Sequence, residues 1–290
     1  MTVSFSDVRT CSHCSRFWRK ALLLGLTLAV AGCGGLYRQN ASQWADFPNE
    51  PGTVSVMSFN VRVGGQPADA ALDAIADASP DLVCLQEVTR AFAGHFEQRL
   101  AAAYPYRVFV PGPTIQGIGI ASRFPITDAN LLELDLPHLP AVAATVRPDA
   151  GPVHVACVHF VTPFARFGPQ AGLMERYYRH RKMRVGQARA LLQHIDSVDM
   201  PAIVLGDMNE WEGQAALAVF ADAGFRNACH ARGSRCTATW PGRAVIGPAI
   251  FRIDHILGRG VDFRPAAVLN SGGSDHYPVV ARFALGAAVP

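Results

Sequence analysis

The chain has 290 residues, half of them hydrophobic, which is enough to bury the core of one large α/β domain, the alternative being two small domains. The formal net charge is +3 at pH 7, but residues 1–32 hold four basic residues and one acid, so the remainder carries 22 residues of each sign. A remainder with no net charge gives no overall electrostatic reason for non-specific binding to nucleic acid.

The N-terminal segment has the pattern of a secretory signal. Three basic residues, Arg16, Arg19 and Lys20, precede a short apolar run over 21–31. The run is too short to span a bilayer comfortably, which argues against the alternative of a transmembrane anchor. We therefore predict a signal peptide over 1–32.

The residues around Cys33 resemble the bacterial lipobox, because Cys33 follows Ala31-Gly32. This resemblance implies that Cys33 is the lipidated first residue of the mature protein. Gly34 after it implies retention at the periplasmic face of the outer membrane. The polar stretch 33–52 is interpreted as a tether, and 53–286 as the folded domain.

The elements of the domain are predicted from apolar periodicity and turn residues. Helices are expected at 67–78, 90–103, 173–198 and 212–223. Strands are expected at 53–61, 82–88, 106–110, 117–123, 141–147, 153–160, 202–206, 237–240, 252–258 and 276–284. Many strands with few helices between them predict two mixed sheets packed face to face, with helices outside.

Apart from Cys33, the cysteines divide into three pairs. Cys11 and Cys14 lie in the predicted signal and have no second pair, so they are not taken as a zinc site. Cys84 and Cys157 lie in apolar strands and are interpreted as core residues. Cys229 and Cys236 flank a short polar loop, and in an oxidising periplasm we expect them to form a disulfide.

Polar residues stand at the ends of five apolar runs, where α/β enzymes place catalytic groups. In chain order these residues are Asn60, Gln86-Glu87, His159, Gly206-Asp207-Met208-Asn209, and finally Asp254-His255 followed by Ser274-Asp275-His276. Each has a structural alternative, such as a turn residue, a helix cap or a half-buried histidine. One shared functional site explains all five sets of residues better than five independent structural roles do.

This ordered set resembles the endonuclease/exonuclease/phosphatase superfamily, the deoxyribonuclease I-like fold, over about 53–284. The resemblance implies a four-layer α/β/β/α sandwich and metal-dependent attack of water on a phosphoester. Glu87 is the expected ligand of Mg²⁺ or Mn²⁺, with Asn60 and Asp275 nearby, because hard cations prefer oxygen ligands.

The resemblance also implies catalytic roles, and the chemistry of the side chains fits them. Asp207 is expected to position and deprotonate the attacking water, and Asn209 to hold the phosphate. His159 and His276 would donate hydrogen bonds to the phosphoryl oxygens, and Asp254 would orient His276. The neighbouring His255 points to the other face of its strand and is interpreted as a packed histidine.

Two departures from the DNA-repair members of the family affect the interpretation. Arg62 stands where those members carry a second metal-binding carboxylate, and His159 stands where they use Tyr. Both differences favour the deoxyribonuclease, phosphatase and sphingomyelinase branches.

A basic segment over 175–189 is the main candidate for substrate binding. It includes Arg179, Arg181 and Arg184 with interleaved aromatic residues, and its alternative is a solvated helix face. Phospholipid head groups are the nearest anions for a lipid-anchored enzyme, whereas aromatic residues between basic ones would also suit nucleic acid. A third interpretation is an inactive binding lipoprotein. A monomer is expected.

Overall fold

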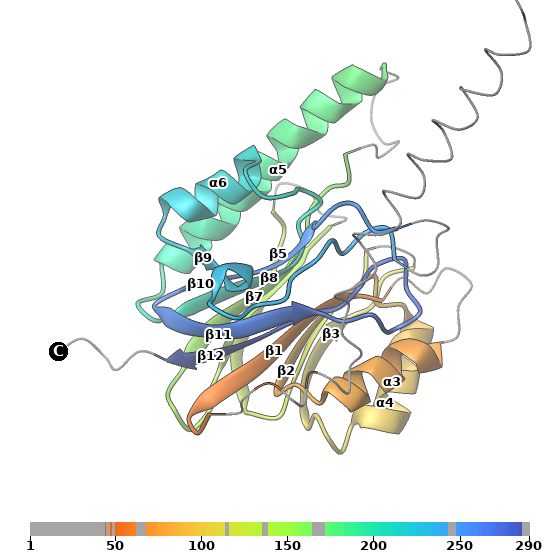
Figure 1. Ribbon diagram of the computed structural model, residues 1–290, viewed down its shortest axis with the longest axis vertical. Helices are drawn as coiled ribbons and strands as arrows, with labels where there is room; N and C mark the ends of the chain where they lie inside the picture. The colour runs from red at the N-terminus through yellow and green to blue at the C-terminus, as the bar shows by residue number, and fades with distance from the viewer. Residues whose placement is uncertain are drawn as a thin grey trace, which may run out of the picture. The chain divides into compact units, whose positions relative to one another are not determined.

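The computed structural model describes residues 44, 47, 50–61, 68–113, 116–134, 139–163, 172–242 and 248–285. Two six-stranded sheets pack face to face, and helices cover the outer side of each (Figure 1). This arrangement confirms the predicted four-layer sandwich of two mixed sheets. All described residues belong to one unit, residues 38–290.

The first sheet has the strand order β11-β12-β1-β2-β4-β3. Its strands are β1 (Thr53–Asn60), β2 (Leu82–Gln86), β3 (Tyr106–Val110), β4 (Ile118–Ser122), β11 (Val261–Val268) and β12 (Val279–Leu285). Its one parallel pair is β1 with β2, in which Asn60 lies beside Gln86. The carboxyl ends of these two strands therefore deliver their last residues to the same edge of the sheet.

The second sheet has the order β5-β6-β7-β8-β10-β9. Its strands are β5 (Ile126–Leu132), β6 (Ala141–Val146), β7 (Val153–His159), β8 (Ala202–Asp207), β9 (Arg226–Asn227) and β10 (Asp254–Arg259). Strands β7 and β8 are parallel and pair His159 with Asp207, and antiparallel β10 places Asp254 beside Asp207. Three polar residues thus meet at one edge of this sheet.

Alternating side chains of the strands build three apolar layers. Val56 of β1 and Ile203 of β8 point between the sheets, whereas Phe59 and Val204 point outward under the helices. The outer face of the first sheet is covered by α3 (Ala68–Ala78) and α4 (Arg90–Leu100), and that of the second by α5 (Leu173–Asp196) and α6 (Ala215–Asp222). The short 3-10 helix η1 (Ala228–His230) follows β9.

The structure differs from the sequence predictions mainly near the C-terminus. The predicted strand 237–240 is only an isolated bridge between Trp240 and Phe251, while β5, β9 and β11 were not predicted. Strand β11 contains Pro265 and a break in register between Phe263 and Ala266. A proline is tolerated there because β11 is an edge strand. In the sequence, however, a proline within a run argues against a strand, and so β11 was missed.

Part of the predicted tether belongs to the folded unit. Trp44 and Phe47 are buried in the apolar layer between the first sheet and its covering helices. The Arg282 guanidinium lies 4.2 Å from the centre of the Trp44 ring. The domain therefore begins before the predicted boundary at 53. Among the residues described, no helix is both long and apolar enough to cross a membrane.

Candidate active site

Asp207 lies at the centre of the residues that the strand ends bring together. Its carboxylate accepts hydrogen bonds from the Asn60 side chain at 3.1 Å and from the Asn209 backbone N–H at 2.9 Å. The Nε2 atoms of His159 and His276 lie 3.5 and 3.6 Å from Asp207 Oδ2. Burial is the largest effect on Asp207 and raises its pKa. The buried carboxylate thus lies among polar side chains.

His276 and Asp254 form a hydrogen-bonded pair. The His276 Nδ1–H donates to Asp254 Oδ2 at 2.9 Å, so its Nε2 faces Asp207. Burial alone would lower the pKa of His276, but the charges of Asp254 and Asp207 outweigh burial and raise the pKa to about 10. The ring is therefore held as a cation that can donate a proton from Nε2.

Glu87 follows directly after β2 and has φ 61°, in the left-handed region that non-glycine residues rarely adopt. Its carboxylate accepts a hydrogen bond from Asn60 at 3.1 Å, and burial raises its pKa. Asn209 also has positive φ, at 50°. Such conformations cost roughly 1–3 kcal/mol each and persist where the surrounding structure enforces them, which is common at functional sites.

Gly206 allows the two parallel strands of the second sheet to approach closely. A Cβ atom at this position would lie 1.9 Å from the carbonyl oxygen of Val158 on β7. Any other residue would therefore push β8 away from β7. The glycine before Asp207 is thus a packing requirement of the site.

The site opens into a cavity of about 480 Å³. Its polar wall contains Glu87, His159, Asp207, Asn209, Asp275 and His276. Its apolar wall includes three stacked rings: Trp211 lies 5.4 Å from Phe251, and Phe251 lies 6.2 Å from Trp240, both at 27° between planes. Tyr177 of α5 also lines the cavity, so this helix borders the site.

The donor set fits a divalent cation. Three carboxylates, those of Glu87, Asp207 and Asp275, face one cavity, and buried like charges require a compensating positive charge. Within the described ranges, Asp207, Asp254 and His276 also have ligand atoms within 4.8 Å of one another. Because His276 already donates to Asp254, that trio is better suited to hydrogen bonding, which leaves Glu87 and Asp275 for the cation.

The structure brings the predicted catalytic and metal-binding residues into one site but corrects the substrate-binding set. Arg184 is only 1% exposed, and its guanidinium donates to Glu210 at 3.0 Å and to the Val161 carbonyl at 3.1 Å. It therefore does not face a substrate. Arg179 and Arg181 lie on the partly exposed side of α5.

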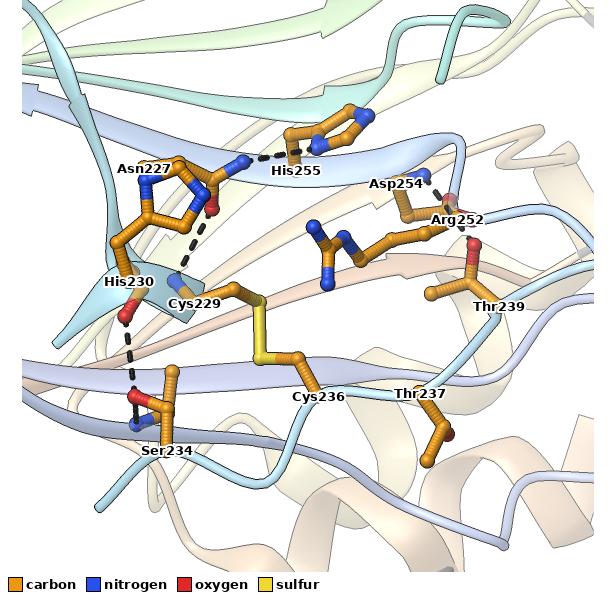
Figure 2. Close-up of a disulfide and its surroundings, with 12 residues drawn as sticks. Asn227, Cys229, His230, Ser234, Cys236, Thr237, Thr239, Arg252, Asp254 and His255 are labelled. Carbon is orange, nitrogen blue, oxygen red and sulfur yellow. Dashed lines mark hydrogen bonds between the residues drawn. A yellow bond between two sulfur atoms is a disulfide. The ribbon is translucent and has the colours of Figure 1, made fainter. Parts of the chain in front are cut away.

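The cysteines required a second correction. Cys84 and Cys157 are buried as predicted, but they are joined in a disulfide between β2 and β7 instead of remaining separate core thiols. The two side chains face each other across the sheets, which strand patterns do not show. Cys229 and Cys236 also form a disulfide, beside Asn227 and His255 (Figure 2). Cys33 and Arg62 lie outside the described residues.

His255 is a packed histidine, as predicted. Its Nε2 contacts the Glu210 carbonyl at 2.8 Å and its Nδ1 contacts Asn227 at 3.2 Å. The aromatic wall was missed, although Trp211 stands two residues after Asn209 and offered a signal in the sequence. Trp240 and Phe251 gave no such signal, because only the fold brings them to Trp211.

Three solved structures with similar folds have TM-scores of 0.61 to 0.62. An endonuclease/exonuclease/phosphatase from Beutenbergia cavernae is 20% identical and covers 81% of this chain and 72% of its own. The human Nocturnin catalytic domain with bound sulfate is 21% identical and covers 80% and 93%. D. rerio TDP2 complexed with single-strand DNA product is 18% identical and covers 80% and 98%. At these identities the similarity shows the fold.

The sequence comparisons identify the family. No curated protein matches the sequence significantly. Residues 57–276, however, match the family model described as the Endonuclease/Exonuclease/phosphatase family, and they contain every residue of the candidate site. The chain belongs to the Endonuclease/Exonuclease/phosphatase family.

Proposed function

We propose that the protein is a Mg²⁺- or Mn²⁺-dependent phosphoester hydrolase whose water is activated by Asp207. The main supporting observation is the position of Asp207 between His159 and His276, 3.5 and 3.6 Å away, in a cavity shared with Glu87 and Asp275. When bound, the cation supplies positive charge that makes a phosphoester accessible to a nucleophile.

The other parts of the reaction are assigned to side chains of the protein. Asp207 positions the water and accepts its proton, while His159 and His276 donate hydrogen bonds to the phosphoryl oxygens as negative charge develops there. Asp254 holds His276 through the bond at 2.9 Å. Asn209, with its backbone N–H on Asp207, supports the carboxylate and borders the phosphate position. Glu87, Asp275 and Asn60 would hold the cation.

The first experiment measures hydrolysis of bis(p-nitrophenyl) phosphate by the purified protein with Mg²⁺ or Mn²⁺. Activity is expected to disappear with EDTA, and Asp207→Asn should lower kcat roughly 100-fold or more, because a positioned base contributes that much. Asp222→Asn, an exposed aspartate of α6, is the matched control and should keep full activity. Normal turnover by Asp207→Asn would disprove the assigned base, and no turnover by the wild type would favour the inactive binding lipoprotein.

For the substrate, we propose a lipid or other membrane-associated phosphoester. The first turns of α5 combine Arg179 and Arg181 with exposed apolar side chains, and Tyr177 of the same segment lines the cavity. The exposed side chains are Leu173 (56%), Met174 (59%) and Tyr178 (54%). Cationic and apolar side chains together suit an anionic bilayer surface. Nucleic acid is the second candidate, because the stacked rings of Trp211, Phe251 and Trp240 also suit a base.

A double charge reversal separates these substrates. Arg179→Glu with Arg181→Glu should lower phospholipid hydrolysis and binding to vesicles of phosphatidylglycerol at least about tenfold, because each basic residue near an anionic surface contributes about 1 kcal/mol. Turnover of the soluble chromogenic ester should be unchanged. Arg189→Glu, in the second half of α5, is the control. If the wild type cleaves single-stranded DNA and no lipid, the nuclease assignment replaces the lipid one.

We further propose that the protein is exported and anchored through Cys33 to the periplasmic face of the outer membrane. The two disulfides support an oxidising compartment, because they form and persist there. Radiolabelled palmitate should label the wild type in cells and leave Cys33→Ala unlabelled. A soluble, unlabelled wild-type protein would exclude the anchor.

A further inference from the structure

The buried disulfide Cys84–Cys157 joins the two sheets next to the candidate active site. Its cysteines are 73 residues apart in sequence, lie on β2 and β7, and are fully buried. Their Cα atoms are 5.4 Å apart. Packed sheets normally lie about 10 Å apart, so the sheets are unusually close at this point.

The candidate active site is divided between the same two sheets. Asn60 and His276 belong to the first sheet or the loop entering it, whereas Asp207 and Asp254 belong to the second. The contacts between the halves are direct: Asn60 Nδ2 lies 3.1 Å from Asp207, and His276 Nδ1 lies 2.9 Å from Asp254. A small shift of one sheet against the other would break both contacts.

The disulfide lies only a short way along the strands from these contacts. Cys157 is two residues before His159 and pairs with Leu205, which is two residues before Asp207. Cys84 is three residues before Glu87. At about 3.3 Å per residue, the disulfide lies about 7–10 Å along the strands from the reacting groups.

Gln86 links the disulfide to the site. Its buried side-chain amide lies 2.8 Å from Cys84 Sγ and 3.7 Å from Cys157 Sγ. The next residue is Glu87, whose backbone has positive φ. The disulfide thus contacts the residue that directly precedes Glu87.

We propose that the Cys84–Cys157 disulfide is a positioning element of the active site, which holds the two sheets where the Asn60–Asp207 and His276–Asp254 contacts form. The hydrophobic contacts between the sheets are non-directional. They do not fix the positions of catalytic groups to within the roughly 0.5 Å that such sites need. A covalent link across the layer does. This inference rests on the proposed hydrolase function.

The test compares the two disulfides of the same chain. Cys84→Ala with Cys157→Val removes the link and keeps apolar volume. Cys229→Ser with Cys236→Ser removes a link between cysteines that are only seven positions apart in sequence. Both variants are checked by circular dichroism and assayed well below their unfolding temperatures. We expect the first variant to lose about 100-fold in kcat with little change in KM, as for misplaced catalytic groups. The second should stay within about twofold of wild type, because its short loop carries no group of the site.

A binding measurement complements the assay. Mn²⁺ binding followed by electron paramagnetic resonance should weaken about tenfold in the Cys84→Ala, Cys157→Val variant, as when residues supporting a metal site are lost. Equal kcat and equal Mn²⁺ affinity in this variant and in wild type would overturn the positioning role. If the variant is unfolded, wild-type protein produced with both thiols reduced, as shown by alkylation and mass spectrometry, takes its place under the same criteria.

The two proposals can fail separately. A wild type that hydrolyses no phosphoester disproves the function, and Mn²⁺ affinity alone then decides the positioning role. A wild type that is active together with an equally active unlinked variant disproves only the positioning role. If the disulfide were merely stabilising, its removal would lower the unfolding temperature and leave kcat and Mn²⁺ affinity unchanged.

Discussion

At the scale of single residues, His154 shows how burial makes stability depend on pH. It lies near the start of β7, is buried, and neither ring nitrogen has a hydrogen-bond partner within the described ranges. Burial, and then the nearby His194, lower the pKa of His154 to about 4. The folded protein therefore keeps this ring neutral at a pH where the unfolded chain would protonate it.

The sign of the pH effect follows from this depressed pKa. Between the ordinary histidine pKa near 6.5 and the folded value of about 4, the unfolded chain binds a proton that the folded one does not, so stability falls as pH decreases. Over this window, His154 lowers the free energy of unfolding by about 3 kcal/mol in total. His154→Leu should flatten the decrease in unfolding free energy over this window, measured by urea denaturation. The control His95→Leu, on the exposed side of α4, should keep the wild-type slope.

At the scale of elements, the buried pair Arg184–Glu210 connects α5 to the loop that follows β8. Glu210 also accepts a hydrogen bond from the Ala216 N–H at the start of α6, at 2.8 Å. Arg184 donates to the Val161 carbonyl after β7. One ion pair thus joins two helices and two loops that border the cavity.

Breaking this pair should destabilise the whole domain. Arg184→Met leaves the Glu210 carboxylate buried without its partner, and such changes cost about 3–5 kcal/mol. Arg189→Met on the exposed side of the same helix is the control and should change stability by about 0.5 kcal/mol or less. Both values come from urea unfolding at pH 7. Equal losses of unfolding free energy in the two variants would contradict a stabilising role of the Arg184–Glu210 pair.

At the scale of the whole molecule, the carboxylates at the end of both sheets repel one another. A cation bound to the folded state alone should relieve this repulsion and stabilise the fold by about 2.7 kcal/mol at a concentration 100 times its Kd. For a domain of this size the unfolding temperature should rise about 5–10 °C with Mg²⁺ or Mn²⁺. Glu87→Gln should lose most of this rise, and Glu133→Gln, an exposed control, should keep it. A full rise in Glu87→Gln would remove Glu87 from the cation site.

The sequence, with the family resemblance that it carries, predicted the sandwich and the polar residues of the candidate site. Buried strands have regular apolar runs, and polar residues such as Asn60, Glu87 and Asp207 stand at the ends of those runs. This signal is visible in the sequence because it involves only residues that are adjacent along the chain. His255 could be interpreted as packed from its alternation with Asp254. The predictions for these single residues depend only on neighbours along one strand.

The remaining features depend on which strands and helices face each other, and only the folded structure decided them. Cys84 and Cys157 pair because β2 and β7 meet across the core, although 73 residues separate them. Arg184 looked like a surface residue, because a basic helix pattern does not show that Glu210 lies under that one position. Trp240 and Phe251 form the aromatic wall through a loop contact with Trp211. Contacts between distant segments leave no periodic signal, because they are set by packing in three dimensions.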